Sequence, residues 1–205
     1  MCFFNNMIVF EGLDGAGTTT QNKLLEEKLV LMGKRVFMTH EPTDNPIGKV
    51  VRSVLQHKFI TTPEALALLY SSDRHDHIYN PEYGIEKHLK SGEIVLLDRF
   101  FYSSIAYQGV ECDLDFVRRI NDYPNPGYVI FIDTPVENCL RRIEKRGDEK
   151  ELFDREDYLT KVRNNYISEF EKLPKEVNFL KVDGSLPVDV IHEKIFSWLS
   201  SCFNL

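Results

Sequence analysis

The sequence predicts an α/β fold in which a five-stranded parallel sheet is flanked by helices. Short, nearly continuous apolar runs alternate with longer segments whose apolar residues recur at helical spacing. Strands that are apolar throughout are typical of a parallel sheet buried on both faces. The chain has 205 residues, of which 42% are hydrophobic, and this fits one domain with a sizeable core. Because we find no internal repeat or linker, we expect a single domain over residues 1–205.

Five apolar runs are the predicted strands, and most of them end in polar residues. They cover residues 7–10, 35–39, 94–97, 128–132 and 179–182. Glu11, Glu41, Asp98 and Asp133 each lie just past a strand end. Since ligands of such folds bind at the carboxyl ends of the strands, we expect these side chains to share one rim.

The helical segments follow from periodicity and from end signals. Predicted helices cover residues 19–32, 47–57, 63–78, 83–90, 136–146, 156–173 and 188–203, with further helices between the third and fourth strands. Gly33 ends the first helical pattern, and Thr62 before Pro63 is a candidate N-cap. The alternation of strand and helix along the chain supports the parallel sheet.

Composition excludes several classes of function. The net charge of −7 disfavours a nucleic-acid polymer as a partner, although it allows a single nucleotide in a local cationic pocket. The four cysteines are scattered, which argues against a zinc site or a disulfide framework and favours the cytoplasm. We find no signal peptide and no apolar run of about 20 residues, so no membrane association is expected.

The segment FEGLDGAGTTTQ carries the strongest motif. Gly12 and Gly17 have the spacing of a phosphate-binding loop, placed between a buried strand and a helix start. Such a loop directs backbone N–H groups at an anion, and the helix dipole adds to them. Thr19 occupies the place of the hydroxyl that binds Mg²⁺, but Thr18 stands where the phosphate-contacting Lys is usual. The loss of that charge leaves two interpretations open: another cation replaces it, or the segment is a glycine turn without this role.

The remaining motifs resemble those of the thymidylate kinase family. FEGLDGAGTTTQ, THEP, SSDR and LLDRFFYSSIAYQG follow in the family's order, and the resemblance covers about residues 7–199. It implies a three-layer P-loop nucleoside monophosphate kinase fold. It also implies transfer of the γ-phosphoryl group of ATP to dTMP, with Mg²⁺ as cofactor, by a cytoplasmic homodimer.

The resemblance also implies roles for individual residues. The loop residues would bind ATP: Gly12, Leu13, Asp14, Gly15, Ala16, Gly17, Thr18 and Thr19. Thr19 and Asp98 would hold the metal, and Asp98 and Arg99 would act at the reacting phosphates. An Arg fork suits a phosphate well, whereas the dipeptide alone would equally fit a salt-bridged strand end.

Other residues would form the acceptor site. Tyr70 would stack on thymine, and Arg74, one helical turn later, would contact base and phosphate. The remaining acceptor residues would be Asp14, Glu41, Pro42, Arg52, Arg99, Ser103, Ser104, Tyr107 and Gln108. Tyr107 beside the sugar would exclude a 2′-hydroxyl by bulk. Ordinary alternatives are core packing for Tyr107, a solvated helix face for Arg52 and an exposed arginine beside a core aromatic for Arg74.

A basic segment near residues 142–157 corresponds to the family's lid. We hypothesise that Arg146 or Arg155 supplies the charge missing at Thr18, as lid arginines do in many family members whose loop lacks an early basic residue. The alternative is a solvated charge run. At the level of the whole protein, the alternatives to a dTMP kinase are a catalytically impaired regulatory protein that binds nucleotides and a kinase of another nucleotide.

Overall fold

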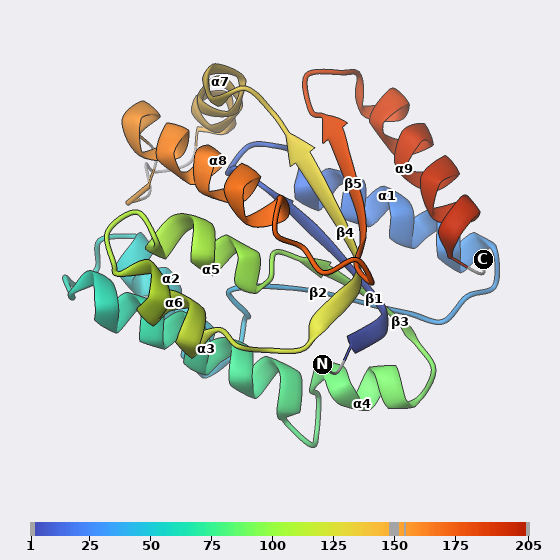
Figure 1. Cartoon of the computed structure of the whole chain (residues 1–205), viewed down its shortest axis with the longest axis horizontal. Coiled ribbons are helices and arrows are strands. Elements are labelled where there is room, and N and C mark those ends of the chain that lie inside the picture. The colour runs from blue at the N-terminus through green and yellow to red at the C-terminus, as the bar shows by residue number, and fades with distance from the viewer. Residues whose placement is uncertain (1–2, 148–151, 154, 204–205) are drawn as a thin grey trace.

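The computed structural model describes residues 3–147, 152–153 and 155–203, and in them it contains the predicted five-stranded parallel sheet (Figure 1). The strand order is β2-β3-β1-β4-β5, and all four pairings are parallel. The strands are β1 (Phe3–Gly12), β2 (Val36–His40), β3 (Ile94–Asp98), β4 (Asn125–Asp133) and β5 (Asn178–Asp183). The α/β class and the sheet expected from the sequence are therefore confirmed.

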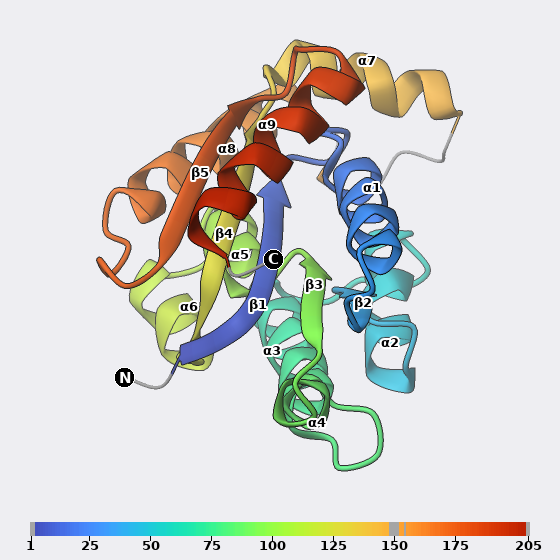
Figure 2. The same cartoon turned by 90° about the vertical axis from the view of Figure 1, so that its right-hand side faces the viewer.

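Helices pack on both faces of this sheet, which gives three layers. They are α1 (Thr18–Leu31), α2 (Pro46–Leu55), α3 (Pro63–Tyr79), α4 (Ile85–Lys90), α5 (Phe101–Gln108), α6 (Leu114–Ile120), α7 (Val136–Arg146), α8 (Glu156–Phe170) and α9 (Val188–Cys202). Helices α1 and α9 lie on one face, and α3, α5 and α8 lie on the other (Figures 1 and 2). The predicted N-cap is present, because the Thr62 hydroxyl accepts a hydrogen bond from the Ala65 amide at 3.2 Å.

Burial explains why the strands were visible in the sequence. Residues Met7 to Phe10 of β1 have no exposed surface, and every residue of β3 is buried. Both strands are central in the sheet, so both of their faces are covered and the apolar run is unbroken. Strands β1 and β4 are longer than predicted, and no bounds were predicted for α5 and α6.

The strand register fixes the position of the polar rim. Phe10 of β1 pairs with Asp98 of β3, and His40 of β2 pairs with the same Asp98. The carboxyl ends of the three strands therefore lie side by side. The loops that follow them meet at this edge of the sheet, where a ligand of a parallel sheet is expected.

Candidate active site

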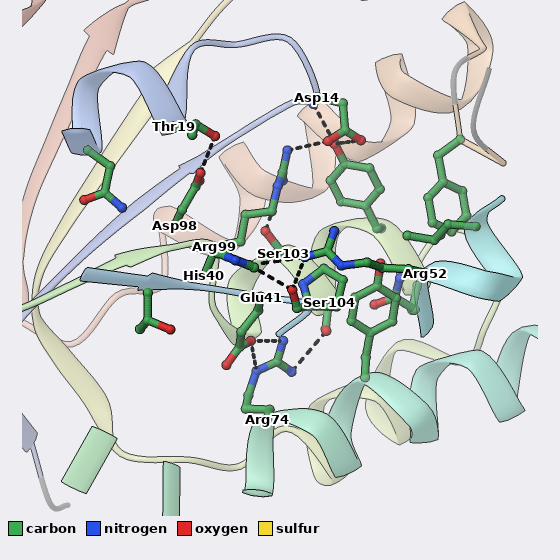
Figure 3. Close-up of a pocket in the computed structure, with 18 of the residues that line it drawn as sticks. Asp14, Thr19, His40, Glu41, Arg52, Arg74, Asp98, Arg99, Ser103 and Ser104 are labelled. Carbon is green, nitrogen blue, oxygen red and sulfur yellow. Dashed lines mark hydrogen bonds and ion pairs between the residues drawn. The ribbon is translucent and has the colours of Figure 1, made fainter. Parts of the chain in front are cut away.

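A cavity of about 740 Å³ opens at this edge of the sheet (Figure 3). Its walls come from the loop after β1, the start of α1, the ends of β2 and β3, and helices α2, α3, α5 and α7. The volume lies in the range of small-molecule sites. The predicted site residues that line it are Asp14, Thr19, Glu41, Pro42, Arg52, Tyr70, Arg74, Asp98, Arg99, Ser103, Ser104, Tyr107, Gln108 and Arg146. These residues, which come from distant parts of the sequence, therefore line one continuous cavity.

The glycine loop joins β1 to α1 as expected. Gly15 and Gly17 have φ angles of +79° and +104°, which L side chains rarely adopt. A Cβ at Gly15 would also lie 2.7 Å from the carbonyl oxygen of Cys139 in α7. The loop is closed by a hydrogen bond of 2.9 Å from the Ala16 amide to the Leu13 carbonyl oxygen. It ends at the N-terminus of α1, where backbone N–H groups are available to an anion.

Thr19 and Asp98 meet at the floor of the cavity. The Thr19 hydroxyl donates a hydrogen bond to one carboxylate oxygen of Asp98 (Figure 3). The other oxygen, Oδ1, is buried and has no hydrogen-bond partner among the described residues. Hydroxyl and carboxylate oxygens suit Mg²⁺, which proteins usually hold with one or two side chains together with substrate phosphates. The two residues therefore fit the metal role that the sequence suggested.

Arg99 adopts an unusual backbone conformation that turns its side chain toward the glycine loop. Its φ angle is +70°, and its amide donates to the Phe10 carbonyl oxygen at 2.9 Å. The guanidinium pairs with Asp14 at 2.7 Å and donates to the Gly12 carbonyl oxygen at 2.8 Å. Burial by itself lowers the pKa of Arg99, but the Asp14 carboxylate and neighbouring groups raise it well above its usual value. Arg99 is thus a fixed positive charge directly below the loop.

Tyr107 holds the same acid from the side of the cavity that Ser104 and Gln108 line. Its hydroxyl donates to Asp14 Oδ2 at 3.0 Å and accepts from the Asp14 amide at 2.9 Å. Burial, followed by the Asp14 carboxylate, raises the pKa of Tyr107 well above 10. The phenol therefore stays protonated and holds Asp14 in a defined position.

Glu11 is not on the rim, contrary to the expectation that grouped it with the other acids after the strands. It is fully buried beneath Arg99, and it accepts hydrogen bonds from the Phe100 amide at 2.9 Å, the Ser103 hydroxyl at 2.6 Å and the Tyr166 hydroxyl at 2.9 Å. Burial raises the pKa of Glu11 to about 7, against the effect of these donors. Glu11 was misplaced because it belongs to β1, and Ser103 of α5 and Tyr166 of α8 cover its side chain.

Asp133 also lies at the expected edge but outside the cavity lining. It forms ion pairs with Arg163 at 2.6 Å and with Lys181 at 2.8 Å. These partners lower its pKa despite burial, which by itself raises the pKa. Of the four acids placed on one rim from the sequence, only Glu41 and Asp98 line the cavity.

Arg74 and Glu41 form a buried ion pair in the wall of the cavity. Two guanidinium nitrogens of Arg74 each lie 2.7 Å from Glu41 Oε2 (Figure 3). Arg74 also donates to the Ser104 hydroxyl at 3.1 Å and to the side-chain oxygen of Asn121. His77 lies 3.1 Å from the other Glu41 oxygen. Arg74 is only 1% exposed, so its guanidinium is locked in place before any ligand contact.

Aromatic and amide groups form the remaining walls. Tyr70 lies one turn before Arg74 on α3, and both line the cavity. Gln108 is buried, and its Oε1 has no partner among the described residues. Phe153, which the sequence reasoning missed, stacks on Tyr158 at a centroid distance of 4.9 Å and lies 5.6 Å from the Tyr107 ring. In the sequence, Phe153 could have been noticed as an aromatic residue within the predicted lid.

Arg52 stands at the far end of the cavity. Its Nη2 donates to the Pro42 carbonyl oxygen at 2.5 Å and lies 3.2 Å from His40 Nδ1. Among the residues that the structure describes, its ion-pair partner is Asp44, with an oxygen at 3.6 Å. The guanidinium is therefore held by the turn after β2.

The two lid arginines have different positions. Arg146, in the last turn of α7, lines the cavity. Arg155 is not part of the lining; it lies 3.6 Å from Asp157 and its guanidinium lies over the Tyr158 ring. Residues 148–151 and 154 of the predicted lid lie outside the described residues. Arg142 belongs to the predicted basic segment but was given no role of its own; it donates to the carbonyl oxygens of Gly15 at 3.2 Å and Ala16 at 3.0 Å, behind the loop.

The parallel sheet, the glycine loop at the start of α1 and the Thr19–Asp98 pair together define an α/β protein of the P-loop nucleotide kinase class. Comparison with known proteins gives the family. The model of the thymidylate kinase family matches residues 10–195. The chain belongs to the thymidylate kinase family, as the sequence motifs indicated.

Three relatives match over most of their length. A protein of Treponema pallidum named "Putative thymidylate kinase" is 37% identical over 203 residues, 97% of each chain. A "Probable thymidylate kinase" of Methanocaldococcus jannaschii is 36% identical, covering 96% of this chain and 97% of its own. One of Pyrococcus horikoshii is 39% identical, covering 90% and 93% respectively. Within the described residues, every helix is too short or too polar to cross a bilayer.

Proposed function

We propose that the protein transfers the γ-phosphoryl group of ATP to dTMP and releases ADP and dTDP. An ionised phosphate oxygen of dTMP attacks the γ-phosphorus, the bond from phosphorus to the β,γ-bridging oxygen breaks, and its electron pair stays on ADP. No proton has to be removed from the nucleophile, so the site needs position and charge more than a base. One observation carries the proposal: a single cavity joins the glycine loop to a pocket lined by Tyr70, Arg74 and Gln108.

The donor half of the cavity fits a triphosphate. The N–H groups of the loop and of the first turn of α1 would hold the phosphate oxygens. Thr19 and Asp98, which are already in contact, would hold Mg²⁺ through the hydroxyl and the free carboxylate oxygen. When bound, the metal would neutralise charge on the phosphates.

The acceptor half fits a pyrimidine deoxynucleotide. Arg99 and Arg52 would bind the dTMP phosphate, since guanidinium groups match phosphate geometry. Tyr70 would stack on the base, and the unpartnered oxygen of Gln108 would accept a hydrogen bond from a base N–H. Asp14, positioned by Tyr107, would accept a hydrogen bond from the sugar 3′-hydroxyl.

Assembly, lid and location belong to the same proposal. We infer a cytoplasmic homodimer with a lid near residues 142–157 that closes over ATP, and Arg146 would approach the phosphates from its present place in the wall. The free cysteines among the described residues, Cys112, Cys139 and Cys202, accord with a reducing compartment.

A coupled assay of ADP formation from ATP, Mg²⁺ and dTMP tests the proposal, with dUMP and ribothymidine monophosphate as competing acceptors. Turnover that depends on dTMP supports it. Stabilisation of the fold by ATP or dTMP without turnover would favour the impaired regulatory protein instead, because a ligand of the native state raises the unfolding midpoint whether or not it reacts. Preference for another acceptor would favour a kinase of that nucleotide.

A further inference from the structure

A lysine on α1 faces the cavity close to the position where the loop lacks one. Lys23 follows Thr19 by four residues, so the two share a helix face and lie about 6 Å apart along the axis. Both line the cavity, together with Asn22. Thr18 is buried, and its methyl group would lie 3.1 Å from a Cβ at Gly12. The loop thus has no cation at position 18, but the same helix carries one, Lys23, about one turn further along.

The arginines of the cavity are already engaged by protein groups. Arg99 pairs with Asp14 at 2.7 Å, and Arg74 pairs with Glu41 at 2.7 Å. The other two, Arg52 and Arg146, also interact with protein groups.

Lys23 differs from them. It is exposed, and its ammonium has no hydrogen bond or ion pair within residues 3–147, 152–153 and 155–203. An ammonium on a flexible four-carbon stem is a movable point charge, and such a group can follow a phosphate as it is transferred.

We infer that Lys23 supplies the positive charge that the loop lysine normally brings to the β- and γ-phosphates of ATP. The inference rests on the phosphoryl transfer proposed above and names a further catalytic residue for it. Charge grows on the β,γ-bridging oxygen as its bond to phosphorus breaks, and an ammonium beside that oxygen stabilises the transition state. Thr19 would place the metal at the same phosphates, so Lys23 approaches them from the metal side of α1.

The first test compares Lys23→Met and Lys23→Arg with the wild-type full-length chain in the coupled ADP assay. Lys28→Met is the matched control, because Lys28 is an exposed lysine of the same helix that lies over the Phe196 ring and does not line the cavity. We expect kcat to fall by about 100-fold in Lys23→Met and by less in Lys23→Arg, with the KM for dTMP and the unfolding midpoint nearly unchanged. Lys28→Met should stay within about twofold of the wild type.

The second test asks whether a lysine at 18 makes Lys23 dispensable. Thr18→Lys combined with Lys23→Met should recover at least about tenfold in kcat over Lys23→Met alone, because the charge is restored by the other route. Arg146→Met, measured in parallel, separates the lid contribution.

Several results would overturn the inference. The first is a kcat of Lys23→Met within about threefold of the wild-type value. The second is a fall in kcat that Thr18→Lys does not relieve in the double variant, although the Thr18→Lys single variant is active. If Thr18→Lys alone is inactive, equal losses in Lys23→Met and Lys23→Arg overturn the inference, and a clear advantage of Arg supports it. No dTMP-dependent turnover in the wild type would refute the proposed function itself, whereas full turnover in Lys23→Met refutes only the role of Lys23.

Discussion

Glu11 offers the sharpest test of the site's electrostatics, because a buried carboxyl makes stability depend on pH. Its pKa rises from an ordinary value of 4.5 to about 7 in the folded protein, with burial as the main cause. The folded state therefore holds the proton more tightly than the unfolded state does. The resulting stabilisation is fully present below pH 4.5 and is lost as the pH rises through 7.

The size of the effect follows from the same shift. The difference between about 7 and 4.5 corresponds to about 3 kcal/mol of unfolding free energy lost between pH 4.5 and pH 8. Glu11→Gln removes the titration and keeps the shape. Its carbonyl oxygen can accept from the Phe100 amide, and its amide group can donate to the hydroxyls of Ser103 and Tyr166.

Urea unfolding of both proteins at pH 5, 6, 7 and 8 measures the effect. Because every other titrating group is shared, the difference between the two curves isolates Glu11. We expect the variant to gain between about 2 and 3 kcal/mol relative to the wild type between pH 5 and pH 8. Glu171→Gln, at an exposed position after α8, is the control and should show no such trend. Parallel curves for Glu11→Gln and wild type would refute the reasoning, since Glu11 would then titrate equally in both states.

Three further predictions concern the cavity. Asp98→Asn should lower kcat by about 100-fold and raise the Mg²⁺ concentration needed for half-maximal rate. A Mg²⁺ titration measures this concentration, and an unchanged value would contradict the proposed metal-binding role of Asp98. Tyr107→Phe should reduce the preference for dTMP over 3′-deoxythymidine monophosphate by about tenfold in kcat/KM, because Asp14 loses its anchor and its hold on the 3′-hydroxyl; an unchanged ratio would exclude this role of Tyr107. Gly15→Ala should destabilise the fold by about 2 kcal/mol or more, since φ is +79° and the Cβ would lie 2.7 Å from the Cys139 carbonyl oxygen. Thermal unfolding measures this loss, and an unchanged unfolding midpoint would contradict the prediction.

The fold could be predicted from the sequence because its signals are local. Apolar runs bounded by turn residues predicted all five strands, and the helical spacing of Leu25 and Leu29 marks the buried face of α1. The helices that followed β3 were harder to delimit. Helix α5 is buried at nearly every position, so it lacks the alternation of apolar and polar faces that defines a surface helix.

The sequence motifs were enough to predict which residues line the cavity, but not which of their side chains pair with one another. The motifs predicted Arg74 and Glu41 as site residues, yet their ion pair joins positions 33 residues apart. Contacts between residues far apart in the sequence decide which charged side chains form ion pairs, and a local sequence pattern does not reveal these contacts. The same limit explains Lys23, which is an unremarkable lysine in the sequence and becomes a candidate only because it faces the cavity beside Thr19.

The distribution of paired charges has a consequence for substrate binding. Arg99 can bind a phosphate fully only by loosening its contact with Asp14, which lies 2.7 Å away. Asp14 would remain attached to Tyr107 and would then be free to accept the sugar hydroxyl of the same nucleotide. On the proposed roles of these residues, binding of the acceptor phosphate and recognition of the sugar would be coupled through one ion pair. Lys23 has no such partner to release among the described residues, so the donor phosphates would gain its charge without breaking a contact within the protein. This asymmetry predicts that Asp14→Asn weakens selection for the sugar while leaving ATP affinity largely unchanged, and separate binding measurements of dTMP and ATP would show whether the two halves of the cavity are independent in this way.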